Sequence, residues 1–263
     1  MTPRAEGGDF PWWLVALGLL LGGAYVAIAL DDGARQVLAT LRRGVWITVF
    51  VTVTAFAAAS LVGLGLALMS LSRSLAARQV ARLYVEVVRG IPILVLLLYV
   101  AFVFAPALVA GWNAVTGWVG LEPVRTRDFT LLWRAILALV IAYSAFIAEV
   151  FRAGLQSVDR GQIEAAQALG LRRWHRFRHV VMPQAIRTIL PPLGNDFVAM
   201  VKDSSLVSVV GVLDIAQLGK LTAAGNFRYF ETYNVVALLY LTMTVLLSLG
   251  LRRLERRLGR HGG

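Results

Sequence analysis

The chain has 263 residues, of which 58% are hydrophobic and only 16% are charged, and its mean hydropathy is +0.71. A soluble domain carries roughly 25% charged residues, so this composition excludes an ordinary soluble protein and predicts a membrane protein. The net charge of +11 does not indicate a nucleic-acid-binding protein, because the basic residues are scattered between apolar runs. With no cysteine and three histidines, a disulfide framework is excluded and a metal site is not expected.

Six apolar segments approach or exceed the roughly 20 residues that an α-helix needs to cross a bilayer. They lie at residues 11–30, 44–72, 90–121, 135–148 (extended by 131–133), 188–219 and 232–251. The third segment is expected to kink at Pro106, and the fifth is interrupted by charged residues. We therefore expect an all-α polytopic membrane protein with about six transmembrane helices.

The segments divide the chain into three parts. Residues 1–43 are expected to form a first transmembrane helix and an outside loop, residues 44–252 the transmembrane core, and residues 253–263 a basic tail that meets anionic membrane lipid. If the N-terminus is cytoplasmic, 17 of the 26 Lys and Arg residues lie in inside segments, which predicts that both termini are cytoplasmic. An alternative is that the first segment is a signal peptide cleaved near Ala27-Ile28-Ala29; the other five helices keep their orientation in either case.

Four residues stand at the cytoplasmic mouth of the third segment: Glu86, Arg89, Gly90 and Pro92. Glu86 and Arg89 are three residues apart and can pair on one helix face. The pattern leaves two interpretations open, a gate or a scaffold that fixes how the chain enters the helix.

The longest predicted inside loop spans residues 152–187. Asp159 can cap a short helix with Gln162 three residues later, and Gly170 suits the left-handed stop at the end of that helix. The following segment, 172–181, has apolar residues at helical spacing and basic residues on its other faces, which predicts an amphipathic helix along the membrane surface. A structural interfacial hairpin is the alternative to a docking element.

The fifth segment holds charged groups that are costly inside a membrane and should face protein or water. Asp203 followed by two serines is typical of an N-cap, which would divide the segment into two half-helices near Ser204. We expect Lys202 and this half-helix start to line a substrate path and attract a carboxylate. Weaker candidates, for the ammonium side of the substrate, are Asn195, Asp196 and Glu149. The alternative is structural, with Lys202 paired to Glu149 or Asp196.

The sequence shows no catalytic motif. The pair Gly219-Lys220 is followed by Leu221 where a phosphate-binding loop requires Ser or Thr, so the chain is not expected to hydrolyse ATP. We expect no catalytic residue, no metal site and no cofactor bound by this chain.

The inside loop resembles the EAA loop of ABC importer permeases. The pattern is Glu164-Ala165-Ala166, then Gly170, then an apolar stretch that ends at Pro183. In that family the loop forms a coupling helix that docks in a groove of a separate ATPase subunit, which binds ATP and Mg²⁺. The resemblance implies that the coupling residues of this chain are Glu164, Ala165, Ala166, Gly170 and Leu171.

Further motifs are similar to the branch of this family that takes up polar amino acids, including histidine, glutamine and glutamate permeases. They are "YVEVVRGIPILVLLLY" (84–99), "AYSAFIAEVFRAGLQSVDRGQIEAAQALG" (142–170) and "LPPLGNDFVAMVKDSSLVSVVGVLDI" (190–215). The resemblance covers roughly residues 44–257 and implies a five-helix type I permease core, to which the first helix is an addition. It places the chain in the bacterial cytoplasmic (inner) membrane.

The same resemblance implies three protein partners: an ABC ATPase, an extracytoplasmic amino-acid-binding protein and a second permease subunit, either a copy or a relative. Nucleic acid is not expected as a partner. The alternative function is a stand-alone secondary transporter driven by an ion, which would usually show paired internal repeats; the two halves of this sequence show no convincing repeat.

Overall fold

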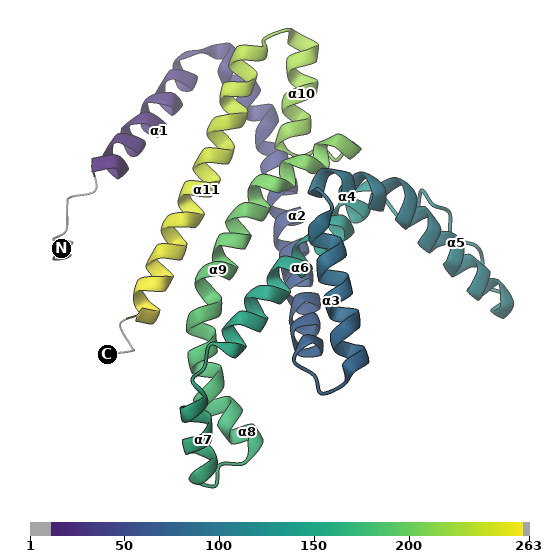
Figure 1. Ribbon diagram of the computed structural model, residues 1–263. Coiled ribbons are helices and arrows are strands. Elements are labelled where there is room, and N and C mark those ends of the chain that lie inside the picture. The colour runs from purple at the N-terminus through teal and green to yellow at the C-terminus, as the bar shows by residue number, and fades with distance from the viewer. Residues whose placement is uncertain (1–11, 260–263) are drawn as a thin grey trace.

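The computed structural model describes residues 12–259, and all regular structure among them is helical (Figure 1). The longer helices are α1 (Trp12–Leu30), α2 (Asp32–Ser70), α3 (Leu75–Gly90), α6 (Leu131–Gln156), α9 (Met182–Asp203), α10 (Ile215–Asn226) and α11 (Tyr229–Gly259). The shorter ones are α4 (Ile93–Tyr99), η1 (Val100–Phe104), α5 (Ala105–Thr116), η2 (Gly117–Val119), α7 (Arg160–Ala168), α8 (Arg173–Arg176), η3 (Phe177–Val181) and η4 (Ser204–Val210).

Five stretches of these helices are long and apolar enough to cross a membrane: α1, α2, the run Ile93–Val119, α6 and a stretch of α11. The remaining predicted segment, 188–219, is built from α9, η4 and α10, so its helix is broken as the sequence predicted. The all-α class of a multi-span membrane protein is thereby confirmed, with five helices among the described residues that meet the length and the sixth predicted segment broken.

Helix α2 begins earlier than predicted. It starts at Asp32 instead of residue 44, because the Asp31 carboxylate accepts hydrogen bonds from the backbone N–H groups of Gly33 (2.7 Å) and Ala34 (3.2 Å). Residues 32–43, expected to form an outside loop, are therefore helical and continue into the second span.

The centre of the bundle is α6, which packs along α2 and also contacts α3 and α9. The side chains of Leu139 and Ile147 are fully buried there. Helices α2 and α6 approach closely at Gly63, where an added Cβ would lie 2.9 Å from Cγ2 of Ile147 and 3.0 Å from the backbone oxygen of Ser144. A glycine at this position therefore sets the distance between the two helices.

The predicted irregularity near Pro106 is present, one turn earlier than the proline. Residues Val100–Phe104 form a π-helical turn in which the Ala105 N–H donates to the carbonyl of Val100. Pro106 follows within the first turn of α5, and its missing N–H removes one hydrogen bond to the π-helical turn that precedes it. Beyond this turn α5 extends away from the bundle as an arm (Figure 1).

Helix α1 lies at the periphery, where Ile28 is its one buried residue. It contacts α2 and α11. The hydroxyls of Tyr25 and Thr242 lie 3.1 Å apart, and the Arg252 guanidinium lies 5.0 Å from the centre of the Trp13 ring. The last contact places the two ends of the described chain near each other. The basic tail predicted from residue 253 continues α11 as far as Gly259, and residues 260–263 lie outside the described part.

Candidate functional site

The loop between α6 and α9 folds as its capping signals predicted. Asp159 accepts hydrogen bonds from the N–H groups of Gly161 (2.7 Å) and Gln162 (3.3 Å) at the start of α7. At its end Gly170 is left-handed (φ 74°) and donates to the carbonyl of Gln167 (2.9 Å), while Leu171 donates to Ala166 (3.1 Å). These two bonds form a Schellman motif, which fixes how the chain leaves the helix.

The predicted coupling residues mostly face outward. Glu164 and Ala165 are exposed on α7, Ala166 is buried, and Gly170 and Leu171 are exposed at the turn. Two large apolar side chains lie beside them, Leu169 (82% exposed) and Trp174 (63% exposed). Exposed apolar side chains beside basic residues suit a protein interface better than a free surface.

The basic helix expected along the membrane surface is not a separate element. Helix α8, the π-helical turn η3 and α9 follow one another with right-handed helical dihedral angles at every junction. The segment is therefore the first part of one long helix that runs from the loop into the bundle. Gln162 of α7 accepts a hydrogen bond from the side-chain amide of Gln184 in α9 (2.5 Å), which ties the two sides of the loop together.

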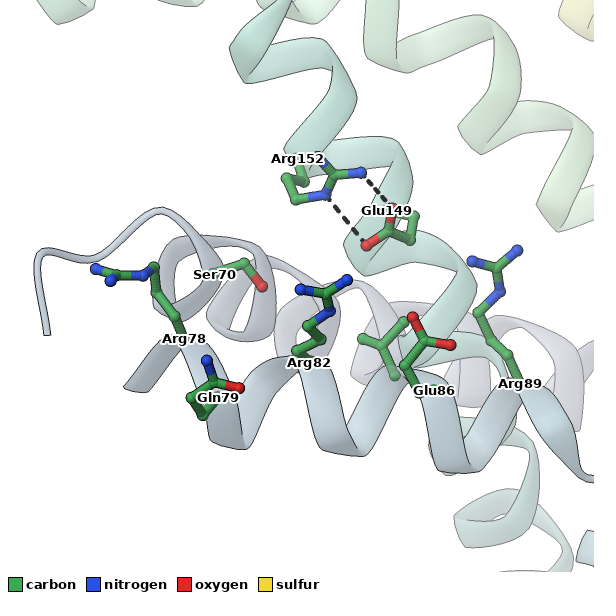
Figure 2. Close-up of a pocket in the computed structure, with 9 residues that line it drawn as sticks. Ser70, Arg78, Gln79, Arg82, Glu86, Arg89, Glu149 and Arg152 are labelled. Atoms are coloured by element: carbon green, nitrogen blue, oxygen red, sulfur yellow. Dashed lines mark hydrogen bonds and ion pairs between the residues drawn. The ribbon is translucent and has the colours of Figure 1, made fainter. Parts of the chain in front are cut away.

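A polar cavity of about 420 Å³ lies where α6 approaches this loop (Figure 2). Helix α3 forms its floor and α6 its opposite wall. The residues that line it are Ser70, Arg78, Gln79, Arg82, Val85, Glu86, Arg89, Glu149 and Arg152. We call this cavity the α3–α6 pocket. Four guanidinium groups and two carboxylates line it, so its lining has an excess of positive charge.

The α3–α6 pocket contains Glu86, Arg89 and Glu149, three of the predicted site residues. In the part of the chain that the structure describes, no ion pair joins Glu86 to Arg89; the Arg89 guanidinium lies 5.5 Å from the centre of the Phe146 ring. Glu149 instead pairs with Arg152 of its own helix, at 2.5 Å and 3.2 Å. The pair that the spacing of Glu86 and Arg89 allows is therefore not formed in this structure.

Gly90 and Pro92 form the elbow between α3 and α4. Ile91, between them, is extended (φ −101°, ψ 129°), as a residue before proline prefers, and α4 starts directly after Pro92. Their position supports the scaffold interpretation for these two residues.

Lys202 and Glu149 lie in different places, so the predicted structural pair between them is wrong. Lys202 is exposed in a groove of about 270 Å³ between α1, α9 and α11, together with Trp13 and Arg252. Among residues 12–259 no ion pair joins Lys202 to Asp196 either. Because adjacent residues of a helix point in different directions, Lys202 and Asp203 face different neighbours.

Asp203 faces α6, where its carboxylate accepts a hydrogen bond from the hydroxyl of Tyr143 (2.7 Å). Asp196, about two turns earlier in α9, is half-buried, and one of its carboxylate oxygens is buried without a hydrogen-bond partner. Asn195 is exposed, and the buried Ser204 hydroxyl donates to the carbonyl of Val201 (2.7 Å). Tyr143 and Asp203, with Asp196 nearby, thus form a polar contact inside the bundle.

The predicted cap at Asp203 is wrong, because its side chain makes no capping hydrogen bond and η4 follows it directly. The second half-helix, α10, starts instead after Asp214, which accepts from the N–H of Gln217 (2.8 Å) and the hydroxyl of Tyr240 (2.9 Å). The sequence carried a signal for this, since Asp214 stands three residues before Gln217 as in a capping box. Sequence reasoning also missed Tyr143, whose contact with Asp203 joins residues 60 positions apart.

No group of three or more metal-binding side chains occurs within residues 12–259. The candidate site is therefore made of the exposed loop, the α3–α6 pocket and the polar contact between α6 and α9.

Known proteins share both the sequence and the fold. The chain is 37% identical over 218 residues to the glutamine transport system permease protein GlnP of Escherichia coli K12, covering 83% of this chain and 92% of that protein. It is 35% identical over 210 residues to the probable amino-acid permease protein YxeN of Bacillus subtilis, covering 80% and 87%. A crystal structure of an amino acid ABC transporter with histidines matches with a TM-score of 0.70 and 36% identity, covering 83% of this chain and 94% of that one.

The fold also matches an inward-facing MetNI methionine ABC transporter, with a TM-score of 0.65 at 22% identity. Residues 59–260 match the family described as the binding-protein-dependent transport system inner membrane component. The match leaves α1 and the first part of α2 outside it. It also contradicts the alternative of a stand-alone, ion-driven transporter. The chain therefore belongs to the family of inner membrane permease components of binding-protein-dependent ABC importers.

Proposed function

We propose that this permease moves polar amino acids into the cytoplasm, and that its loop 152–187 couples the movement to a separate ATPase subunit. The substrate class is supported by the two relatives, one described as a glutamine permease and one as a probable amino-acid permease. We propose that both termini and the loop lie on the cytoplasmic side, and the excess of Lys and Arg in these segments supports this orientation.

The observation that carries the coupling proposal is the geometry of α7. Its start is capped by Asp159 and its end is fixed by Gly170, so a short helix is held in one conformation outside the bundle. Leu169 and Trp174 supply an exposed apolar surface, and Glu164 a charge, for contact with a partner. ATP and Mg²⁺ would be bound by that partner, and this chain supplies the surface through which nucleotide-driven movement reaches the membrane.

The remaining partners follow from the family. A binding-protein-dependent system requires an extracytoplasmic protein that delivers the substrate, and we propose an amino-acid-binding protein in this role. We propose a second permease subunit, a copy of this chain or a relative, as the other half of the path. The basic end of α11 is proposed to contact anionic lipid.

We propose that the substrate path runs beside the polar contact between α6 and α9. Asp203 and Asp196 would attract the ammonium group of an amino acid, with Asn195 and Ser204 close to them in the chain. An aspartate oxygen that is buried without a partner, as at Asp196, is costly unless a ligand or water satisfies it. Lys202 lies in the groove beside α1, so a contribution from it to the path is a separate proposal.

The first test is purification of the tagged chain from its native membranes in mild detergent, with mass spectrometry of the proteins that accompany it. Wild type is expected to retain an ATPase subunit, and Glu164→Ala and Gly170→Val are expected to lose it. Valine at a left-handed position costs roughly 1–2 kcal/mol, whereas Gly170→Asn, which tolerates this conformation, is expected to retain the partner.

The matched control for the charge change is Glu122→Ala, an exposed glutamate outside the loop. It removes the same charge and is expected to leave the complex intact. Retention of the ATPase by both loop variants, or purification of wild type alone, would refute the coupling proposal.

A further inference from the structure

Several charged side chains that line the α3–α6 pocket form no ion pair with one another. Arg152 is paired with Glu149, and the Arg78 guanidinium donates to the carbonyls of Ser72 (3.0 Å) and Arg73 (2.9 Å). Three charged side chains of the lining remain without an ionic partner: Arg82, Glu86, and Arg89, whose guanidinium lies over the Phe146 ring. Among the residues that the structure describes, none of the three forms an ion pair.

These three side chains lie on one face of α3. Their spacing of four and three residues places them one above the other along the helix, with the carboxylate between the two guanidinium groups. Figure 2 shows Arg82, Glu86 and Arg89 rising from α3 on the side that faces Glu149 and Arg152. The order along the pocket is therefore positive, negative, positive.

This order fits one kind of ligand. A carboxylate is bound well by a guanidinium, because the fork of N–H donors matches its two oxygens, and an ammonium group is bound by a carboxylate. A phosphate or other simple anion would use the arginines but leave the Glu86 carboxylate between them without a partner, whereas a zwitterion supplies a partner for both kinds of charge. A cavity of about 420 Å³ lies within the range of small-molecule sites.

We propose that the α3–α6 pocket binds the head group of an α-amino acid, with the α-carboxylate on Arg82 or Arg89 and the α-ammonium on Glu86. This proposal rests on the proposed function, since it names the same substrate class. It assigns a second site, separate from the contact of Tyr143 with Asp203. On the proposed orientation the pocket opens on the cytoplasmic side, where it is filled by an amino acid after transport or by the cytoplasmic pool.

The absence of cysteine from the chain allows a local test. Gln79→Cys places a single thiol in the pocket lining, to be labelled with an environment-sensitive fluorophore. The labelled permease is assembled with its ATPase, made free of cysteine, in lipid nanodiscs without binding protein. L-glutamine is the probe, because the proposal concerns the head group that all α-amino acids share.

Titration with L-glutamine is expected to give a saturable change in fluorescence. Glutaramic acid, which lacks the α-ammonium, and 4-aminobutanamide, which lacks the α-carboxylate, are each expected to bind more weakly by roughly tenfold or more. Glu86→Gln and Arg89→Gln are expected to raise the midpoint for L-glutamine by a similar factor. Arg73→Gln, at an exposed arginine that does not line the pocket, is the matched control, and it is expected to leave the midpoint unchanged.

Three results would overturn the proposal. They are no saturable signal with wild type, equal binding of glutamine and its two analogues, and an unchanged midpoint in both Glu86→Gln and Arg89→Gln. Folding of each variant is checked by its retention of the ATPase. The same label at Trp118→Cys, an exposed residue in η2, is expected to give no signal.

Two experiments distinguish a failure of the pocket proposal from a failure of the proposed function. If the wild-type complex takes up amino acid in proteoliposomes with its binding protein but the pocket gives no signal, the pocket proposal alone fails. If wild type retains no ATPase and shows no uptake, the proposed function fails with it.

Discussion

The start of α10 offers the sharpest test of how the broken helix is held. Asp214 is fully buried and accepts two hydrogen bonds, from the Gln217 N–H (2.8 Å) and the Tyr240 hydroxyl (2.9 Å). Asp214→Ala removes a helix cap, which costs about 1 kcal/mol, and leaves the Tyr240 hydroxyl without its acceptor, which costs about 1–3 kcal/mol. We expect the free energy of unfolding to fall by about 2–4 kcal/mol.

The assay is reversible unfolding of the purified chain in mixed micelles, with the sodium dodecyl sulfate fraction increased and helix content followed by circular dichroism. Asp214→Asn keeps an equally good capping oxygen and is expected to lose less than about 1 kcal/mol. Tyr240→Phe is expected to lose about 1 kcal/mol, and its effect should be largely absent when Asp214 is already alanine. An Asp214→Ala chain within about 0.5 kcal/mol of wild type would show that the cap contributes nothing.

Three further outcomes are expected. Gly63→Ala should lower the free energy of unfolding by about 1–3 kcal/mol, because its Cβ meets α6 at 2.9 Å, whereas Gly65→Ala, with open space around it, should be neutral or stabilising in the same assay. Uptake in proteoliposomes should fall by roughly tenfold or more in Asp203→Asn and much less in Lys202→Ala, and the reverse order would place the path in the groove beside α1. Backbone N–H groups at the start of α2 hold the pKa of Asp31 below its ordinary 3.8. The ionised carboxylate therefore stabilises the fold fully at pH values above 3.8, and this stabilisation is lost as the pH falls through the lower folded-state pKa. The difference in stability between wild type and Asp31→Asn should vanish in acid. A difference that stays constant with pH would count against this cap.

Local signals predicted local structure well. The capping of α7 by Asp159 and its left-handed end at Gly170 depend on residues within a few positions of each other, so the sequence carried enough information. The same rules applied at Asp203 were wrong because a 3-10 turn follows it, and the true cap, Asp214, lies eleven residues later. Polarity alone did not distinguish the two aspartates.

Contacts between residues far apart in the chain could not be predicted from the sequence. Glu149 was a candidate partner for Lys202, but Arg152 on the same helix is nearer and holds it. The α3–α6 pocket depends on how closely two helices approach, which the spacing of Glu86 and Arg89 does not show. The function was predicted from the resemblance to a family, whereas the pocket was found only from the packing of α3 against α6.

Helix α9 belongs to two different packing groups. Ala185 and Ile189, near its start, are buried in a small cluster with residues of the loop, whereas Met200, near its end, belongs to the main core. Pro191 and Pro192 lie between these halves and donate no backbone hydrogen bond. Bending concentrates at such positions, so we expect any bend of α9 to fall at the proline pair, between the half that packs with the loop and the half that packs in the core.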